Sequence, residues 1–275
     1  MIAIKDLEFS YGKKSVFKNI SLDFEKGHIY GLLGENGVGK TTLLKLISGL
    51  QKPSKGSCYV NEVASYDRRP DMLSQIFFIS EDFAIPNSTP LKYVTALGAF
   101  YPRFNLEYFK ELSKEFEIDP QQRYACMSFG QKKKALIATA LSLRTDYLLL
   151  DEPTNGLDIP SKTIFRRVIS QYCSDDNTII ISTHQVKDIE NLIDPIIILD
   201  SAEVLLKASF KDITDKLYFD YSTTGNSEAI YQEMIPGGFI NILSNNEGLD
   251  SKVNIETLFN AVLKNKNTIK QILNK

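Results

Sequence analysis

A glycine-rich segment of nine residues carries the clearest chemistry in the chain. It reads Gly34, Glu35, Asn36, Gly37, Val38, Gly39, Lys40, Thr41 and Thr42. These residues fit the phosphate-binding pattern G-x-x-x-x-G-K-[ST], known as Walker A. Its glycines let backbone N–H groups surround a polyphosphate, Lys40 reaches the β- and γ-phosphates, and the Thr41 hydroxyl binds Mg²⁺. The segment therefore predicts a nucleoside triphosphate site.

The residues on either side of this loop support the same interpretation. The apolar run 29–33 precedes it and predicts a strand, and residues 42–47 follow it and predict a helix. The order strand, loop and helix is the one that the pattern needs, because the helix N-terminus adds its dipole to the anion site. A glycine-rich turn that binds nothing does not require these neighbours.

A second segment supplies carboxylates. Residues 147–150 are an apolar strand, which ends in Asp151 and Glu152. Ligands of α/β sheets collect at the carboxyl ends of strands. We expect Asp151 to hold Mg²⁺, through water, and Glu152 to act as the general base toward the attacking water. Apolar strands often end in acidic residues, so this segment gains its meaning from the phosphate loop.

A third segment lies between these two and reads Met127, Ser128, Phe129, Gly130 and Gln131. The order of the three segments resembles that of the ATP-binding cassette (ABC) ATPases, whose signature is Leu-Ser-Gly-Gly-Gln. The chain keeps the serine, the second glycine and the glutamine, with Met and Phe at the other two positions. The resemblance covers roughly residues 1–205.

The resemblance implies a shared site between two cassettes that face each other head to tail. ATP would lie between the phosphate loop of one subunit and Ser128, Gly130 and Gln131 of the other, with Phe129 pointing away from the nucleotide. Gly130 matters most there, because a Cβ would hold the backbone off the phosphate.

Further positions match the family one by one. The resemblance implies that Tyr11 stacks on adenine and that the loop 155–158, which ends at Asp158, crosses the dimer interface. It also implies that His184 senses the γ-phosphate and sets the water together with Glu152. Glu81 stands where the family has a glutamine that touches Mg²⁺, so it is expected near the metal with a full negative charge.

The elements that must position these residues follow from apolar periodicity. Residues 2–9 and 20–24 alternate as half-buried strands, and four apolar runs without alternation are typical of a parallel sheet covered on both faces. These runs are 76–79, 147–150, 178–181 and 196–199, and helical spacing falls at 129–143, 160–172 and 185–192. The fold class is therefore α/β: a P-loop NTPase core, mostly a parallel sheet flanked by helices, with an N-terminal antiparallel β subdomain.

The chain divides into an ATPase domain over residues 1–207 and a small C-terminal α+β extension over residues 208–275. A helical insertion is expected at about 86–143, with helices at 90–99 and 105–117. The extension shows turn sequences, short strands and a closing helix at 254–265, but no motif for chemistry.

Composition and charge argue against a nucleic-acid-binding protein, a membrane-spanning protein and a protein built on disulfides. The net charge of −2 gives no global attraction to nucleic acid, and no apolar run reaches the length that spans a bilayer. Three widely spaced cysteines, Cys58, Cys126 and Cys173, indicate buried or half-buried thiols of a reducing compartment. The chain is thus expected in the cytoplasm, without nucleic acid, on the inner face of the membrane through a partner.

Three functions are compatible with these observations. The first is the nucleotide-binding subunit of an ABC transporter, with ATP and Mg²⁺, a second ATPase subunit (the same or a different chain) and a membrane-spanning permease. Residues 100–105, Glu81 and the loop 155–158 resemble ABC-2-type exporters, so export is the expected direction. The second is a soluble cassette that acts on ribosomes or nucleic acid, although Lys132–Lys134 is better explained as a solvated helix face. The third is a cassette that does not hydrolyse ATP, against which Glu152 and His184 argue.

Overall fold

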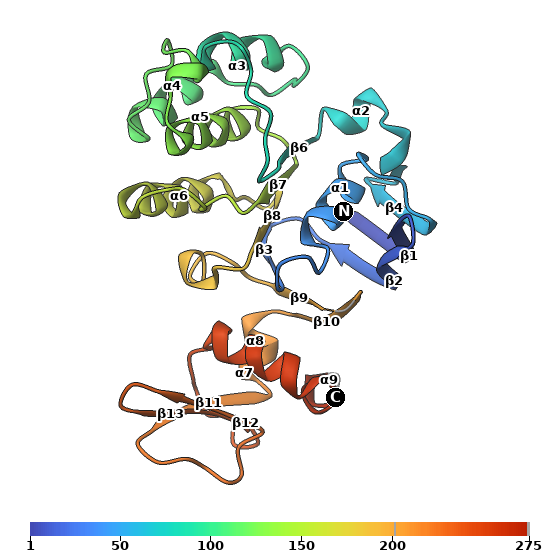
Figure 1. Ribbon diagram of the computed structural model, residues 1–275, viewed down its shortest axis with the longest axis vertical. Coiled ribbons are helices and arrows are strands. Elements are labelled where there is room, and N and C mark those ends of the chain that lie inside the picture. The colour runs from blue at the N-terminus through green and yellow to red at the C-terminus, as the bar shows by residue number, and fades with distance from the viewer. Residues whose placement is uncertain (201, 274–275) are drawn as a thin grey trace.

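A six-stranded sheet forms the centre of the protein, whose computed structural model describes residues 1–200 and 202–273 (Figure 1). The strand order is β10-β9-β3-β8-β7-β6. All neighbours are parallel except β10, which pairs antiparallel with β9 at the edge. The strands are β3 His28–Leu33, β6 Ile76–Ile79, β7 Tyr147–Asp151, β8 Thr178–Thr183, β9 Ile196–Asp200 and β10 Glu203–Ala208. The predicted α/β class with a mostly parallel sheet is confirmed.

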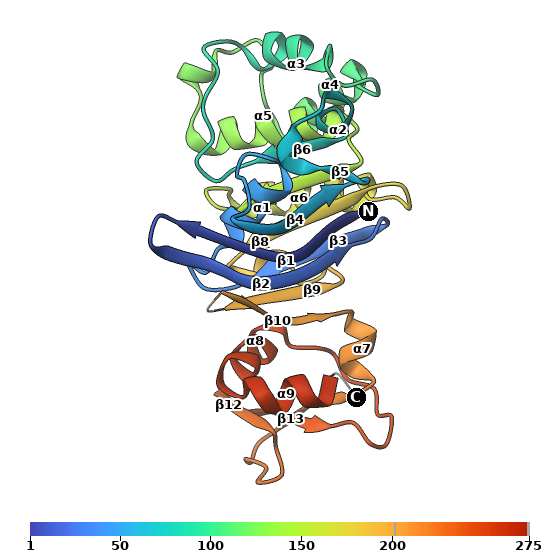
Figure 2. The same ribbon diagram turned by 90° about the vertical axis from the view of Figure 1, so that its right-hand side faces the viewer.

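A second, antiparallel sheet lies against one face of this core (Figure 2). Its order is β2-β1-β4-β5, built from β1 Ile2–Tyr11, β2 Lys14–Phe24, β4 Lys55–Val60 and β5 Val63–Ala64. Helix α1, Lys40–Ile47, packs between the two sheets, and its apolar side chains share one buried cluster with residues of both. The helix that follows the phosphate loop is thereby packed against both sheets. The N-terminal antiparallel β subdomain predicted from alternation is present.

Helices cover the opposite face. Helix α5, Phe129–Ser142, and helix α6, Ile159–Tyr172, pack on the sheet, and α3, Pro90–Gly98, and α4, Leu106–Glu115, pack on α5. Short elements complete this part: 3-10 turns η1 Ser65–Asp67 and η2 Tyr124–Cys126, and helix α2 Pro70–Leu73. Thr89, Asn105, Ser128 and Asp158 each cap the start of a helix with a side-chain oxygen.

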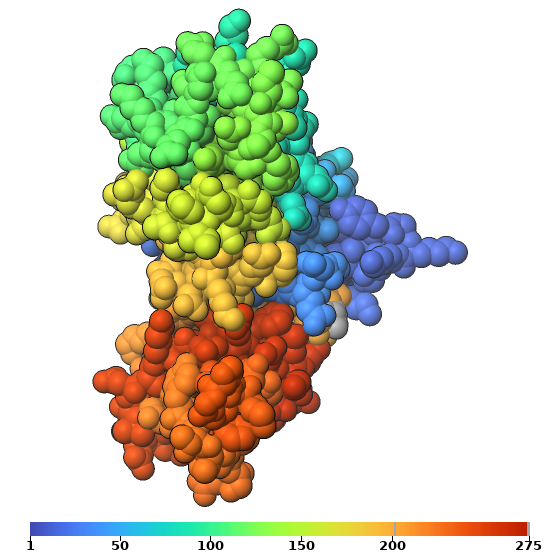
Figure 3. Space-filling model, turned by 60° about the vertical axis from the view of Figure 1, so that its left-hand side comes forward, coloured from blue at the N-terminus to red at the C-terminus, as the bar shows by residue number. Residues whose placement is uncertain are grey.

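The C-terminal extension lies at the end of the molecule opposite the helical insertion (Figure 3). It contains α7 Phe210–Thr214, the sheet β11-β13-β12, and the helices α8 Ile255–Lys264 and α9 Lys266–Leu273. The strands are β11 Leu217–Ser222, β12 Tyr231–Ile235 and β13 Gly238–Ser244. Its buried side chains belong to the same apolar cluster as α5 and α6, so the extension is packed on the α/β core rather than tethered to it.

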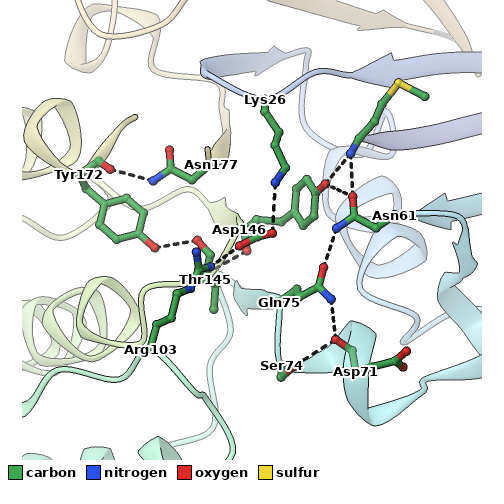
Figure 4. A network of polar contacts seen from close by, with 12 residues as sticks. Lys26, Asn61, Asp71, Ser74, Gln75, Arg103, Thr145, Asp146, Tyr172 and Asn177 are labelled. Atoms are coloured by element: carbon green, nitrogen blue, oxygen red, sulfur yellow. Dashed lines mark hydrogen bonds and ion pairs between the residues drawn. The ribbon is translucent and has the colours of Figure 1, made fainter. Parts of the chain in front are cut away.

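A polar network fastens three parts of the protein to β7 (Figure 4). The Asp146 carboxylate, just before β7, pairs with Lys26 before β3 and with Arg103 of the helical insertion. The Tyr147 hydroxyl accepts a hydrogen bond from the Met1 amine at 2.6 Å and donates one to Asn61 beside β4. These contacts hold the strand that carries Asp151 in a fixed frame.

Two expectations about local structure are wrong, and one helix was not expected. The helix expected at 185–192 is one 3-10 turn, η3 Val186–Asp188, because Arg166 of α6 donates to the Asp188 carbonyl and the chain then turns. Helix α9 follows the expected closing helix without having been predicted. Cys58 is buried and Cys173 half-buried as expected, but Cys126 is exposed in η2.

Within residues 1–200 and 202–273, no helix combines the length and the apolar character that a membrane crossing needs.

We predict that Gly31→Ala destabilises the protein, because β3 approaches Ile193 too closely for a side chain. A Cβ at Gly31 would lie 2.3 Å from the Ile193 Cδ1 atom. The free energy of unfolding, measured in urea, should fall by about 1–3 kcal/mol. Ile193→Val removes that methyl group, so the double variant should lose less than the sum of the two single losses. Additive losses would contradict the proposed contact.

Candidate functional site

A cleft of about 300 Å³ contains most of the residues that sequence analysis assigned to nucleotide. Its walls come from β1 and β2, the phosphate loop with α1, the loop after β6 and the end of β7. The lining residues are Tyr11, Lys14, Val16, Asn36, Gly37, Gly39, Lys40, Thr41, Thr42, Glu81, Asp151 and Glu152. Segments far apart in the sequence thus meet at the carboxyl ends of the parallel strands, as α/β sheets favour.

Lys40 is the buried cation of the cleft. Its ammonium donates to the carbonyls of Gly34 at 2.7 Å and Glu35 at 3.1 Å, and its side chain is 7% exposed. Burial lowers the pKa of Lys40, while the nearby carboxylates of Glu152 and Asp151 oppose this effect. The N-cap residue Gly39 offers no side-chain oxygen, so the first N–H groups of α1 keep their capacity for an anion.

Asp151 and Thr41 fit a divalent cation. Asp151 is 1% exposed, and its carboxylate accepts hydrogen bonds from Thr41 at 2.7 Å and from Ser182 of β8. Both partners are neutral hydroxyls, and no ion pair joins Asp151 to a basic side chain in the described part of the chain. A buried carboxylate beside a hydroxyl, with its charge uncompensated, suits Mg²⁺, which binds one or two protein oxygens and keeps the rest for water and phosphate.

Glu152 of the cleft and His184 form a second pair of functional side chains. Glu152 is 3% exposed, and its Oε1 accepts from the His184 backbone N–H at 3.0 Å and contacts the His184 Nδ1 at 2.7 Å. Thr183 donates to Oε2 at 3.0 Å. A carboxylate only accepts here, so the proton lies on Nδ1 of His184. The structure therefore brings together the two residues that were expected to set the water.

The signature residues lie outside this cleft. Ser128 and Gln131 form a capping box at the start of α5, in which each side chain binds the other residue's backbone. Gly130 lies against the loop after β7, where an added Cβ would be 2.8 Å from the Gly156 carbonyl oxygen. Phe129 is 52% exposed and stacks on Phe83. Their contact with the nucleotide of a second subunit remains a prediction.

Tyr11 and Asp158 occupy different settings. Tyr11 is 45% exposed at the rim of the cleft, with its ring edge-on to Phe9. Asp158 caps α6 by accepting from the Ser161 N–H at 2.9 Å, and hydrogen bonds from Ser161 lower the pKa of its carboxyl. The roles of Tyr11 toward adenine and of Asp158 across an interface remain predictions.

Glu81 lines the cleft, and its nearest partner is a side chain of the chain itself. Asn155 Nδ2 donates to Glu81 Oε1 at 2.9 Å. This contact joins the loop after β6 to the loop after β7. The approach of Glu81 to Mg²⁺ remains a prediction.

Sequence analysis missed three contributors. Ser182 and Thr183 bind the carboxylates of Asp151 and Glu152, and their place directly after the apolar run 178–181, at the end of β8, could have indicated this. The description of Lys132–Lys134 as a solvated face is wrong for Lys133, which is 0% exposed. Its helical phase, three and four residues before buried Leu136 and Ile137, could have placed it inside.

A further cavity of about 350 Å³ separates the His184 loop from the C-terminal extension. The core supplies Glu35, Thr183 and His184 to its walls, and the extension supplies Glu233, Glu256, Phe259 and Asn260. Lys187, in the turn after His184, pairs with Glu256 of α8 at 2.9 Å. The extension therefore contacts the loop that carries His184 directly.

The sequence matches a known family. The model of that family, described as ABC transporter, matches residues 17–155. The ABC transporter ATP-binding protein NatA of Bacillus subtilis (strain 168) is 33% identical over 224 residues, which cover 78% of this chain and 91% of that protein. The cobalt import ATP-binding protein CbiO of Salmonella typhi is 33% identical over 224 residues, covering 75% and 80%. The chain therefore belongs to the ABC transporter ATP-binding proteins, and it is an ATPase that binds ATP.

Solved structures agree with this assignment. A structure described as the ATP binding subunit of an ABC transporter superposes with a TM-score of 0.72 at 26% identity, covering 78% of this chain and 91% of that one. The structure of cbiO1 from Clostridium perfringens, described as part of the ABC transporter complex cbiONQ, gives a TM-score of 0.63 at 25% identity, covering 77% and 89%.

We predict that Lys40→Ala weakens nucleotide binding. The variant removes a buried ammonium that we expect to donate to the charged phosphate oxygens, a loss of about 1.5–3 kcal/mol, or roughly 10- to 100-fold in Kd. Titration with a fluorescent ATP analogue measures the change, and Lys45→Ala in the same helix is the control. Equal affinity of the Lys40 variant and wild type would contradict the assignment of the loop.

Proposed function

We propose that the protein is the nucleotide-binding subunit of an ABC exporter, which works as a head-to-tail dimer on the cytoplasmic face of a membrane-spanning permease. The observation that carries hydrolysis is the contact of the buried Glu152 carboxylate with the exposed His184 imidazole, whose Nδ1 lies 2.7 Å from Oε1. A cassette that only binds ATP does not need a carboxylate held so closely at the end of β7.

The hydrogen bonds of Glu152 identify the atom that accepts the proton. Oε1 already accepts twice, from the His184 N–H and from Nδ1. Oε2 accepts once, from Thr183, and each carboxylate oxygen has two acceptor positions. A water molecule can therefore donate to Oε2 and attack the γ-phosphorus, while the bond to the β–γ bridging oxygen breaks and Oε2 takes the proton.

The remaining groups of the cleft stabilise the negative charge of the phosphates. Lys40 and the free N–H groups of α1 are placed for the β- and γ-phosphates, and Thr41 and Asp151 would hold Mg²⁺. The metal, when bound, neutralises charge on the phosphate oxygens. His184 keeps Glu152 oriented, and its Nε2 can donate to a γ-phosphate oxygen when the imidazole carries a second proton.

The dimer follows from the separation of the two halves of the site. Ser128, Gly130 and Gln131 stand at the N-terminus of α5, outside the walls of the cleft of their own subunit. A helix N-terminus binds anions. In a head-to-tail pair, each of these N-termini faces the γ-phosphate held by the other subunit, with Asp158 at the interface. Whether the two subunits are identical depends on the transporter.

An apolar groove supports the permease partner. It has a volume of about 610 Å³ and runs between the end of α1, α2 and α3. Leu50 and Phe100 on its rim are 51% and 73% exposed, and Leu97 and Tyr101 line it. A large exposed apolar patch marks a protein interface, and an amphipathic helix of the permease fits such a groove. The related cbiO1 is itself part of a transporter complex.

Export is proposed from the resemblance of residues 100–105, Glu81 and the loop 155–158 to exporter ATPases. The relative CbiO is named for cobalt import, so the direction needs its own test. Inverted membrane vesicles that accumulate the substrate in the presence of ATP support export, and accumulation only in right-side-out vesicles contradicts it.

We predict that Glu152→Gln lowers the turnover number by roughly 100- to 10,000-fold while ATP still binds, because the amide cannot take the proton. Phosphate release measures turnover, and equilibrium binding measures affinity. Glu107→Gln, in exposed α4, is the matched control. Hydrolysis close to the wild-type rate would remove Glu152 from its role as base.

We predict that Phe100→Asp disrupts the permease contact. Affinity capture from detergent-solubilised membranes should recover a polytopic membrane protein with the wild type, and the variant should recover roughly tenfold less, as for loss of an interface hot spot. ATP affinity should stay unchanged, which shows that the fold is intact. Recovery of ribosomes in place of a membrane protein would contradict the transporter function.

A further inference from the structure

We propose that Lys133 is a positioning residue for hydrolysis, which holds the loop after β7 in its active shape, and that Glu81 is the counter-charge of Lys133. The inference deepens the proposed function, because it rests on Glu152 being the base. It also gives the acid at position 81 a role within this chain that does not require the metal.

Lys133 ties the signature helix to the loop that follows β7. Its ammonium, on a fully buried side chain of α5, donates to the Glu152 carbonyl at 2.6 Å and to the Asn155 carbonyl at 2.9 Å. Both ends of the turn 152–155 are therefore bound by one cation. Two charge-assisted hydrogen bonds to backbone fix this turn more firmly than neutral ones would.

The turn needs such a restraint. Glu152 has a φ of 47°, in the left-handed region that residues other than glycine rarely adopt. A conformation of this kind costs of order 1–3 kcal/mol and persists only where its surroundings enforce it. The carbonyl of Glu152 is the atom that Lys133 binds most closely. Lys133 thus enforces the backbone conformation that sends the Glu152 carboxylate toward His184.

A buried ammonium requires compensation, and Lys133 has no ion-pair partner among residues 1–200 and 202–273. Burial is the main cause that lowers the pKa of Lys133, and of the carboxylates that oppose it Glu81 has the largest effect, followed by Glu152 and Asp151. Glu152 and Asp151 already serve the cleft. Glu81 is therefore the carboxylate whose charge is available to Lys133.

Asn155 connects Glu81 to Lys133. Its amide Nδ2 donates to Glu81, and its carbonyl accepts from Lys133. A carboxylate only accepts, so it fixes which end of the Asn155 amide turns toward residue 81. A glutamine at 81 would present a donor or an acceptor and leave that orientation open. The glutamate is thus chemically distinct from glutamine at this position.

Phe129 covers the same ammonium. The Lys133 Nζ lies 5.5 Å from the centroid of the Phe129 ring, and that ring stacks on Phe83 with centroids 5.6 Å apart. Cations are attracted to aromatic faces at this range. An added Cβ at Gly156 would be 2.7 Å from Phe129, so the ring also lies on the loop after β7. The phenylalanine in the signature therefore belongs to the Lys133 cluster, defined here as Glu81, Phe83, Phe129, Lys133 and Asn155.

A double-mutant cycle tests the inference, with Lys133→Met, Glu81→Gln and the double variant in the full-length protein. The turnover number should fall about 10- to 100-fold in Lys133→Met, as for a displaced catalytic group, with the KM for ATP changed less than about threefold. Glu81→Gln should lower turnover in the wild type but cost less than about twofold in the Lys133→Met background, because the charge it compensates is gone.

Two further measurements separate positioning from loss of fold and from metal binding. Amide hydrogen exchange over residues 152–156 should rise in Lys133→Met and not in the control Lys132→Met, which removes a neighbouring charge on the same helix. The Mg²⁺ concentration for half-maximal nucleotide binding should stay within about twofold in Glu81→Gln. If Lys133→Met does not fold, Lys133→Gln completes the cycle with an uncharged donor.

Equal losses from Glu81→Gln in both backgrounds would overturn the inference, and so would a large shift in the Mg²⁺ requirement. Unchanged turnover in Lys133→Met would also overturn it. If Glu152→Gln still abolished hydrolysis in that case, only the inference would fail and the proposed function would stand.

Discussion

Two adjacent carboxylates at the buried end of one strand are the constraint on which this site depends. Asp151 and Glu152 are 1% and 3% exposed, and unpaired charges at such depth are costly. Each carboxylate oxygen accepts a hydrogen bond. Thr41 and Ser182 donate to Asp151, and Thr183 and His184 donate to Glu152. The Lys40 ammonium lies 3.9 Å from the Glu152 carboxylate, within ion-pair range. A nucleotide with its metal completes a site whose charges are already arranged.

The signature helix has two functions that are separable in space. Its first turn is capped internally by Ser128 and Gln131, so an empty subunit leaves no strain there. One turn further on, Lys133 reaches into the core and touches the backbone of the loop after β7. Since both lie on α5, the helical insertion cannot tilt without acting on that loop. The contacts thereby link the apolar groove proposed for the permease to the residues proposed for hydrolysis.

Much of the fold and cleft could be predicted from sequence, for a physical reason. The phosphate loop and the strand that ends in Asp151 are local patterns with a strict order, and long apolar runs such as 178–181 have few alternatives. The rest depended on tertiary contacts. Lys133 shares its residue type with Lys132 and Lys134, and only packing makes it buried. The segment 185–192 has helical spacing, but Arg166 from another helix stops it after one turn.

The C-terminal extension forms one wall of the cavity beside His184, and this has consequences for experiments and for sequence change in the tail. Glu256 and Asn260 belong to α8, yet they line a cavity shared with Thr183 and His184. A protein cut after residue 207 would open that cavity to solvent and release Lys187 from Glu256. Kinetic constants from such a fragment would describe a different enzyme. Substitutions that reshape this wall would thus act beside His184, although the tail carries no motif of its own.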